Sequence, residues 1–265
     1  MTHSLRIISW NINSLRLRLP LLERLTHEAR PDIICLQETK VEDALFPLDA
    51  VRALGYEHCV FRGQKSYHGV AIASRIPLRN VEMWDVVGDA SARHISATLD
   101  NGIHVHNLYV PAGGDIPDPA LNPKFAEKLR CVQEMTRRAA TMTQQPSILV
   151  GDFNIAPLEH DVWSHKQLSD VVSHTPIEIA HCHAWREAGA WRDVARHFIP
   201  HTEKLYSWWS YRARDWKASN RGRRLDHIWV SPHLYDACIA YESFPHMRDW
   251  EQPSDHIPIM LTFSL

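Results

Sequence analysis

Short apolar runs recur along the whole chain, and polar residues stand at their ends. Most of these runs are rich in Ile, Val and Leu, and their length and composition are typical of buried β-strands. The runs with the most informative ends are residues 5–10, 33–36, 103–108, 147–150, 228–230 and 257–263. We expect a strand at each of them, and one more within residues 68–75.

Local signals predict one hairpin and two helices. The Asn-Gly pair at 101–102 separates two strand-like runs, 93–99 and 103–110, which predicts a β-hairpin. One helix is indicated by an apolar face alone, and another by Asn122 as N-cap with Pro123 at the first helical position. Their apolar positions are Leu21, Leu22, Leu25 and Ala29 in the first, and Phe125, Leu129, Val132 and Ala139 in the second. Hairpins with intervening helices favour α+β layers.

Size and composition favour one domain over residues 1–265. Of the 265 residues, 45% are hydrophobic and 23% charged, and no linker-like stretch interrupts them. The first residues lack the pattern of a secretory leader, and no apolar stretch reaches the roughly 20 residues of a membrane helix. Five scattered cysteines without a Cys-x-x-Cys pair indicate free thiols in a reducing compartment. We expect a cytoplasmic monomer with no membrane association.

The net charge of −2 does not decide for or against nucleic acid, but the distribution of charge is informative. Residues 212–224 contain six basic side chains and one acidic one, and the aromatic-rich segment 206–211 precedes them. Basic groups can neutralise phosphates while aromatic rings stack on bases. A solvated basic loop with Trp208 and Trp209 half-buried in the core explains the same pattern equally well.

The polar residues at the strand ends indicate one shared site. In a mixed sheet, the C-terminal end of one strand and the N-terminal end of an opposed strand lie at the same edge. We therefore expect these residues to converge on one rim, where carboxylates without a cysteine suit Mg²⁺ or Mn²⁺. The rim residues are Asn11, Glu38, Tyr109, Asp152, Asn154, Asp226, Asp255 and His256.

Several rim residues suit hydrolysis of a phosphodiester. Glu38 is a candidate metal ligand, although it can also be a plain surface glutamate. Asp152 can orient or deprotonate water with Asn154 beside it, although Gly-Asp-x-Asn is also a common turn. His256, kept protonated by carboxylates such as Asp226, can donate to a phosphate oxygen, whereas a lone Asp-His pair is more often structural.

Six short motifs follow one another over almost the whole chain. They are Ser-Trp-Asn-Ile-Asn at 9–13, Leu-Gln-Glu-Thr-Lys at 36–40, Tyr-Val-Pro at 109–111, Gly-Asp-Phe-Asn at 151–154, Asn-Arg-Gly-x-Arg-Leu-Asp at 220–226 and Pro-Ser-Asp-His-x-Pro at 253–258. In this order they resemble the exonuclease III family of apurinic/apyrimidinic endonucleases. The resemblance implies an α/β (α+β) four-layer sandwich, with two mixed β-sheets packed face to face and helices on both outer faces. It also implies Mg²⁺-dependent cleavage 5′ to abasic sites in duplex DNA, with 3′-phosphodiesterase and 3′→5′ exonuclease activity.

The resemblance also implies a role for each site residue. Glu38 resembles the main metal ligand, Asp152 the residue that activates water, and His256 the phosphate-binding histidine paired to Asp226. The metal region would comprise Asn11, Glu38, Asp152, Asn154, Asp255 and His256. The residues toward DNA would be Asn11 and Tyr109 at the scissile phosphate, Asn13 nearby, Trp208 and Leu225 around the flipped abasic sugar, and Arg93 and Arg212 facing the duplex.

Three features depart from the relatives and bear on substrate preference. Asn13 is neutral where some relatives place a second carboxylate, so we expect weaker binding of the divalent ion. Arg223 replaces a bulky apolar pocket residue of animal relatives, and it either shapes the pocket or turns toward a phosphate. The Pro- and Gly-rich loop at 111–123 differs from the DNA-wedging loop of those relatives, and we expect it beside the rim.

The leading hypothesis is a Mg²⁺-dependent DNA repair phosphodiesterase, with Mn²⁺ as an alternative metal. Its substrate would be double-stranded DNA with an abasic site or a 3′ end. The alternatives are an enzyme that is mainly a 3′→5′ exodeoxyribonuclease, a phosphodiesterase of the same superfamily acting on a lipid or inositol phosphate head group, and an inactive DNA-binding module. The basic and aromatic run favours DNA, and the intact set of carboxylates with His256 favours activity.

Overall fold

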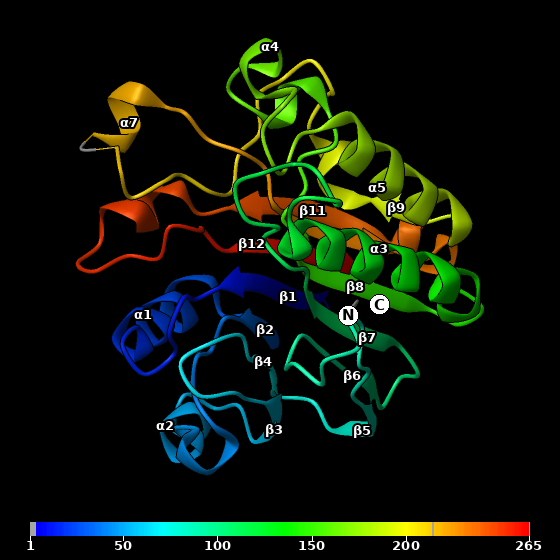
Figure 1. The fold of residues 1–265 in the computed structure, drawn as a ribbon. Helices are drawn as coiled ribbons and strands as arrows, with labels where there is room; N and C mark the ends of the chain where they lie inside the picture. The colour runs from blue at the N-terminus through cyan, green and yellow to red at the C-terminus, as the bar shows by residue number, and fades with distance from the viewer. Residues whose placement is uncertain (1–3, 214, 265) are drawn as a thin grey trace.

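The computed structural model describes residues 4–213 and 215–264, which form two mixed six-stranded sheets packed face to face (Figure 1). In spatial order, the first sheet contains β11 (Cys238–Ser243), β12 (Ile259–Ser264), β1 (Ser4–Asn11), β2 (Ile33–Gln37), β4 (Val70–Ser74) and β3 (His58–Arg62). The second contains β5 (Leu78–Glu82), β6 (His94–Leu99), β7 (His104–Tyr109), β8 (Ser147–Asp152), β10 (Asp226–Val230) and β9 (Arg192–Asp193). Each sheet has one parallel pair, β1 with β2 and β7 with β8.

Helices cover the outer faces of the two sheets (Figure 1). α1 (Leu19–Ala29) and α2 (Leu48–Ala53) pack on the first sheet, and α3 (Pro123–Met142) and α5 (Pro176–Ala188) pack on the second. The shorter helices are α4 (His165–Leu168), α6 (Val194–Phe198) and α7 (Trp216–Ser219), and 3₁₀ turns span Asp43–Leu45, Glu159–Asp161, Pro232–Ala237 and Pro245–Asp249. The predicted four-layer sandwich is confirmed. Within the described residues, no helix has both the length and the apolar character needed to cross a membrane.

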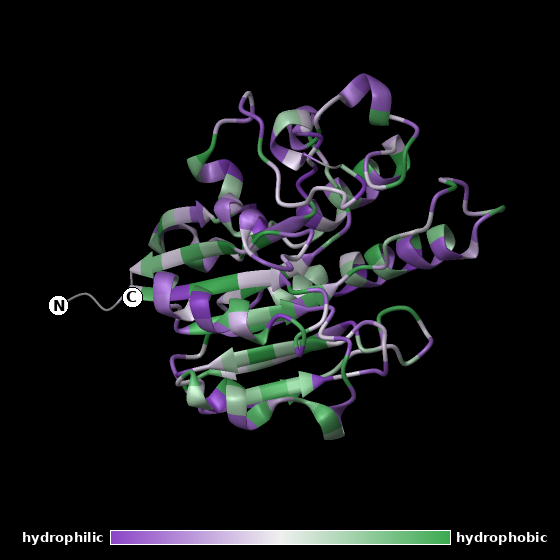
Figure 2. Cartoon of the chain, turned by 90° about the vertical axis from the view of Figure 1, so that its left-hand side faces the viewer, coloured by the Kyte–Doolittle hydropathy of each residue, from purple (hydrophilic) through white to green (hydrophobic). Residues whose placement is uncertain are grey.

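The shared core lies between the sheets, because successive residues of a strand point to opposite faces. In β1, Ile7 faces the second sheet, whereas Ile8 belongs to the apolar cluster under α1. Val105 and Val150 of the second sheet complete the core around Ile7. Burying one such side chain stabilises the fold by roughly 1.5–3 kcal/mol. Figure 2 shows hydrophobic positions gathered in the strands and many hydrophilic ones in the loops.

The elements predicted from local signals are present. The Asn-Gly hairpin joins β6 to β7, with Gly102 in the left-handed region at φ 85°. The Asn122 side chain caps α3 by accepting a hydrogen bond from a backbone N–H at 3.1 Å. Two predicted strands extend by two residues toward the polar clusters. β8 continues to Asp152 and β10 begins at Asp226, because these two polar residues are paired across the ladder.

Candidate active site

The polar clusters meet at one end of the two sheets. Tyr109 and Asp152 are partners in the parallel β7–β8 pair, and Asp226 lies opposite Asp152 in antiparallel β10. From the first sheet, the Asn11 side chain donates to Asp152 Oδ2 at 3.0 Å and to Glu38 Oε1 at 2.9 Å. Strand order therefore brings together side chains that are far apart in sequence.

A cavity of about 490 Å³ opens at these strand ends. The predicted site residues that line it are Glu38, Tyr109, Asp152, Asn154, Trp208, Arg212, Arg223, Leu225, Asp255 and His256. The other four are Asn11, Asn13, Arg93 and Asp226, and each hydrogen-bonds to a residue of the lining. The loop before α3 contributes Ala112, Gly114 and Asp115 to the wall, as expected of a loop beside the rim.

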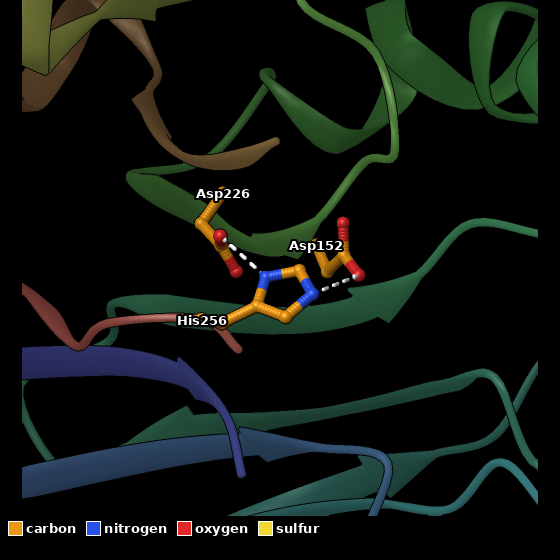
Figure 3. A group of neighbouring side chains, drawn as sticks. All are labelled: Asp152, Asp226 and His256. Atoms are coloured by element: carbon orange, nitrogen blue, oxygen red, sulfur yellow. Dashed lines mark hydrogen bonds and ion pairs between the residues drawn. The ribbon is translucent and has the colours of Figure 1, made fainter. Parts of the chain in front are cut away.

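His256 lies between two carboxylates at the centre of the site (Figure 3). Its Nδ1 is 2.8 Å from Asp226 Oδ2, and its Nε2 is 3.6 Å from Asp152 Oδ2. Burial by itself would lower the pKa of His256, but the charges of Asp226 and Asp152 outweigh it and raise the pKa to about 10. Each ring nitrogen faces a carboxylate oxygen, so the arrangement favours the protonated ring. A fixed cation in this place suits a phosphate group.

Asp152 is buried and accepts hydrogen bonds on both oxygens. The Asn154 backbone N–H donates to Oδ1 at 2.9 Å, and the Asn154 side chain donates to Oδ2 at 3.1 Å. Burial raises the pKa of Asp152 to about 7; Asp226 adds to this effect and His256 opposes it. Gly151 is required before it, because a Cβ there would lie 1.8 Å from a backbone carbonyl oxygen of β7. A carboxyl group with a pKa near neutrality suits a general base.

Glu38 is held by donors on both of its oxygens. The Tyr109 hydroxyl donates to Oε1 at 2.8 Å, and the Lys40 ammonium lies 2.7 Å from Oε2. Burial would raise the pKa of Glu38, but Lys40 and the hydrogen bond from Asn11 together lower it, so the carboxylate is ionised. Burial and the carboxylates of Glu38 and Asp152 raise the pKa of Tyr109 well above its ordinary value. Its hydroxyl therefore remains a donor.

The oxygen atoms around Glu38 fit a divalent cation. The Lys40 ammonium lies 2.7 Å from Glu38 Oε2 and 2.6 Å from Asn13 Oδ1, so two oxygens already converge on one positive charge. Oxygen donors of this kind are preferred by Mg²⁺ and Mn²⁺. His256 and the two carboxylates beside it form another close group of ligand types. Glu38 with Asn13 and the group around His256 are therefore two candidate centres for a metal.

Trp208 and Arg223 stand side by side in the cavity wall. Trp208 Nε1 donates to Asp255 Oδ2 at 2.9 Å, and the Arg223 guanidinium lies 5.4 Å from the centre of the Trp208 ring. Arg223 also donates to the Val172 carbonyl at 2.9 Å and to Ser173 Oγ at 2.7 Å. These contacts hold the Arg223 side chain in the cavity wall.

Arg93 does not face outward, and this expectation is corrected. Only 5% of the residue is exposed, and its guanidinium lies 5.1 Å from the centre of the Tyr109 ring and 3.5 Å from Glu127. A buried guanidinium requires a carboxylate or carbonyl partner, and Arg93 finds both behind Tyr109. Arg93 therefore supports Tyr109 from behind the cavity wall.

Sequence reasoning missed two serines of the site. Ser254 Oγ donates to the Asn11 carbonyl at 2.7 Å and accepts from the His256 N–H at 3.2 Å, which ties β1 to the segment before β12. The sequence signal that could have identified Ser254 is its position directly before Asp255. Ser173, which accepts from Arg223, carries no such signal, because the two residues are 50 positions apart.

Comparisons with known proteins agree with this geometry. Residues 8–256 match the Endonuclease/Exonuclease/phosphatase family. The chain is 31% identical over 275 residues to the exodeoxyribonuclease III of Haemophilus influenzae, covering 98% of this chain and 100% of that protein. Two solved structures, an AP endonuclease from Archaeoglobus fulgidus and a 3′ phosphatase from Neisseria bound to a product DNA hairpin, each have a TM-score of 0.91 and 32% identity, covering 98% of this chain and 100% of theirs. The chain therefore belongs to the endonuclease/exonuclease/phosphatase family, as a metal-dependent phosphodiester hydrolase of the exonuclease III type.

Proposed function

We propose that this protein is a Mg²⁺-dependent DNA repair phosphodiesterase that cleaves duplex DNA 5′ to abasic sites and also acts on 3′ ends. The observation that carries the proposal is the position of His256, whose ring lies 2.8 Å from Asp226 and 3.6 Å from the buried carboxylate of Asp152 in the wall of a cavity. Hydrolysis of a phosphodiester requires such a base for water and such a cation for the charge that develops on the phosphate.

Each residue has its own task in this proposal. Asp152 accepts a proton from the attacking water, since its raised pKa still leaves it ionised above neutrality. His256 donates from Nε2 to a non-bridging phosphate oxygen. Tyr109 and Asn11 donate to Glu38 Oε1 in this structure, so each would serve the scissile phosphate by exchanging that hydrogen bond for one to a phosphate oxygen. A Mg²⁺ ion held by Glu38, with Asn13 beside it, would neutralise charge on the phosphate and stabilise the departing 3′ oxygen.

The cavity wall gives a reason for action at abasic sites. An abasic nucleotide has no base to unstack, so turning it out of the duplex costs less free energy than turning out a normal nucleotide. Trp208 and Leu225 offer apolar contacts for its sugar next to Asp152 and His256. A relative at 32% identity is an AP endonuclease, which supports this part of the proposal.

The segment around α7 is our candidate for the surface that binds the duplex. It projects from the body of the molecule (Figure 1) and carries the exposed side chains of Arg212, Lys217 and Arg221. Arg212 also lines the cavity, so the basic segment continues into the site. Arg214, a further member of the predicted basic run, lies outside the described residues. Basic groups placed in this way can neutralise DNA phosphates.

A second candidate function, a mainly 3′→5′ exodeoxyribonuclease, is favoured by Arg223. Its guanidinium takes up part of the wall that would surround a flipped sugar. A strand that ends at the site needs no flipped nucleotide, so a pocket shaped by Arg223 would hinder this substrate less. The 3′ phosphatase and a 3′–5′ exonuclease from Neisseria, each at 32% identity, support activity at 3′ ends.

We also propose that the enzyme works as a monomer in the cytoplasm. One chain supplies every residue around the cavity, so no second copy is needed to complete it. The five cysteines are free, and four of them are buried, which suits a reducing compartment.

A nicking assay tests the proposal. The substrate is a labelled duplex with one tetrahydrofuran abasic analogue, incubated with Mg²⁺ or with EDTA, beside an intact duplex that has a recessed 3′ end. Metal-dependent cleavage 5′ to the analogue is the expected result. Digestion of the recessed 3′ end alone would favour the second candidate. Cleavage of neither substrate would refute both and favour a phosphodiesterase with a substrate other than DNA.

A further inference from the structure

A buried ion pair lies behind the cavity, apart from the residues assigned above. Lys128 of α3 and Glu178 of α5 both have fully buried side chains, and Lys128 Nζ lies 2.5 Å from Glu178 Oε1. A lysine is almost never fully buried without a specific partner, because removing its charge from water is costly. The pair therefore requires an explanation beyond the packing of two helices.

Lys128 uses its other hydrogen bonds to hold backbone beside the catalytic carboxylate. Its Nζ donates to the Asn154 carbonyl at 2.7 Å and to the Ala112 carbonyl at 3.3 Å. The side chain and N–H of the same Asn154 donate to Asp152. Asn154 has a φ of 53°, in the left-handed region that asparagine adopts more readily than most residues, and its side chain also donates to the Val110 carbonyl at 2.9 Å. One ammonium group thus fixes both this residue and the loop before α3.

Glu178 holds the segment on the other side of the pocket. The Ser173 N–H donates to both carboxylate oxygens at 2.9 Å, and Thr175 donates to Oε2 from its N–H at 3.1 Å and from its hydroxyl at 2.7 Å. The Thr175 N–H bond belongs to the capping box of α5, in which the Glu178 N–H donates in return to Thr175 Oγ1 at 3.4 Å, and a solvated glutamate is sufficient for this motif. The bonds to Ser173 have an additional effect, because they hold the residue whose Oγ accepts the hydrogen bond from Arg223.

We propose that the Lys128–Glu178 pair is a positioning device that locks Asn154 and the Ser173 wall of the pocket into one rigid unit. A buried ion pair often contributes little net stability compared with apolar residues of similar size. Here the pair joins two segments that both border the cavity. One contains Asn154, next to the proposed base, and the other contains Ser173, next to Arg223. The two residues touch no substrate; they act through Asn154 and Ser173. The effect expected on cleavage rests on the proposed function.

The test is the double variant Lys128→Met/Glu178→Gln. It removes both charges and the donor to Asn154, but it keeps the side-chain volumes and an oxygen that can accept from Ser173 and Thr175. We expect the variant to fold and to melt close to the wild type. In contrast, kcat on the abasic duplex should fall by about tenfold or more, with DNA affinity nearly unchanged, since small misplacement of reacting groups has effects of this size. Lys128→Arg should restore part of kcat.

Hydrogen exchange supplies a readout that does not depend on activity. In the double variant, amides in segments 112–114 and 171–175 should exchange faster, whereas those of β1 and α1 should not change. Met142→Ala is the matched control, because it leaves a cavity at the other end of α3 and should lower stability without changing kcat.

Wild-type exchange in both segments, together with wild-type kcat in the double variant, would overturn the proposal. So would a loss of kcat of the same size in Met142→Ala, because it would assign the effect to general destabilisation. If the wild-type enzyme cleaved no DNA substrate, the proposed function would fall, while the exchange data would still decide whether the pair fixes the two segments.

Discussion

Replacing Asp226 by Asn should lower the pKa of His256 and so convert a constant cation into one that titrates near neutrality. The substitution keeps the volume of the side chain and an oxygen that can accept from Nδ1, which lies 2.8 Å away. What it removes is one negative charge. Any change in the pH dependence of the reaction therefore reports on that charge, not on altered packing.

The size of the effect follows from the pKa of His256. Its value of about 10 lies above the ordinary 6.5, a difference of ~3.5 units, which corresponds to roughly 5 kcal/mol in favour of the protonated ring. Burial opposes this state, and Asp226 is the strongest of the groups that favour it. Without that charge, only the carboxylate of Asp152, 3.6 Å from Nε2, remains in close contact. We expect the pKa to fall by about 2 units or more, on the scale of a removed close charge.

The sign of the pH dependence is fixed by the direction of this shift. The raised pKa means that the folded state favours protonated His256; this stability is complete below about pH 6.5 and is lost as pH rises through about 10. The wild-type rate should therefore rise as Asp152 ionises near pH 7 and then hold until strongly alkaline pH. In the variant, kcat should decline with rising pH already near neutrality, by about 10²-fold where the ring becomes neutral.

The assay is kcat on the abasic duplex between about pH 6 and 10, combined with NMR titration of the His256 ring. Asp100→Asn is the control, because its exposed ion pair with Arg79 lies on the surface and should affect neither measurement. The reasoning would be refuted if His256 in the variant still titrated near pH 10. It would also fail if the pKa fell as expected but kcat kept the wild-type pH profile.

Other predictions concern the remaining site residues. Asp152→Asn removes the base and His256→Asn removes the cation, so each should lower kcat by about 10²-fold or more. A near-normal rate of cleavage in single-turnover assays would contradict these roles. Glu38→Ala should raise the Mg²⁺ concentration needed for half-maximal activity, and an unchanged metal titration would exclude Glu38 as a ligand. Arg223→Ala should leave the salt dependence of DNA binding unchanged, because Arg223 is hydrogen-bonded to Val172 and Ser173. It should instead alter the discrimination between abasic and intact duplexes. If the slope of log affinity against log salt fell by about one unit, Arg223 would contact a phosphate.

The fold could be predicted because its signals are local or repeated. Apolar runs mark the strands, the Asn-Gly pair marks the β6–β7 turn, and Asn122 with Pro123 marks the start of α3. The meeting of the rim residues also follows from general rules, because strand ends in a mixed sheet share an edge. The bounds of β8 and β10 could not be predicted, since the polar residues at their ends continue the ladder.

Contacts between distant segments were not accessible from the sequence. Arg93 looks like any surface arginine until β6 and β7 place it behind Tyr109, close to Glu127 of α3. Lys128 likewise looks like a solvated helix residue, and only the packing of α3 against α5 shows that it is buried against Glu178. Burial of a charged side chain depends on its partner, and nothing in the local sequence names that partner.

β12 follows every other strand in sequence, yet it lies inside the first sheet, between β11 and β1. During synthesis, β1 must remain without this neighbour until β12 has left the ribosome, and an open strand edge of this kind invites aggregation. The same order also has a protective consequence. Asp255 and His256 directly precede β12, so a nascent or truncated chain that lacks this segment has Asp152 but not the cation opposite it. The proposed site is therefore complete only after this last segment has been made.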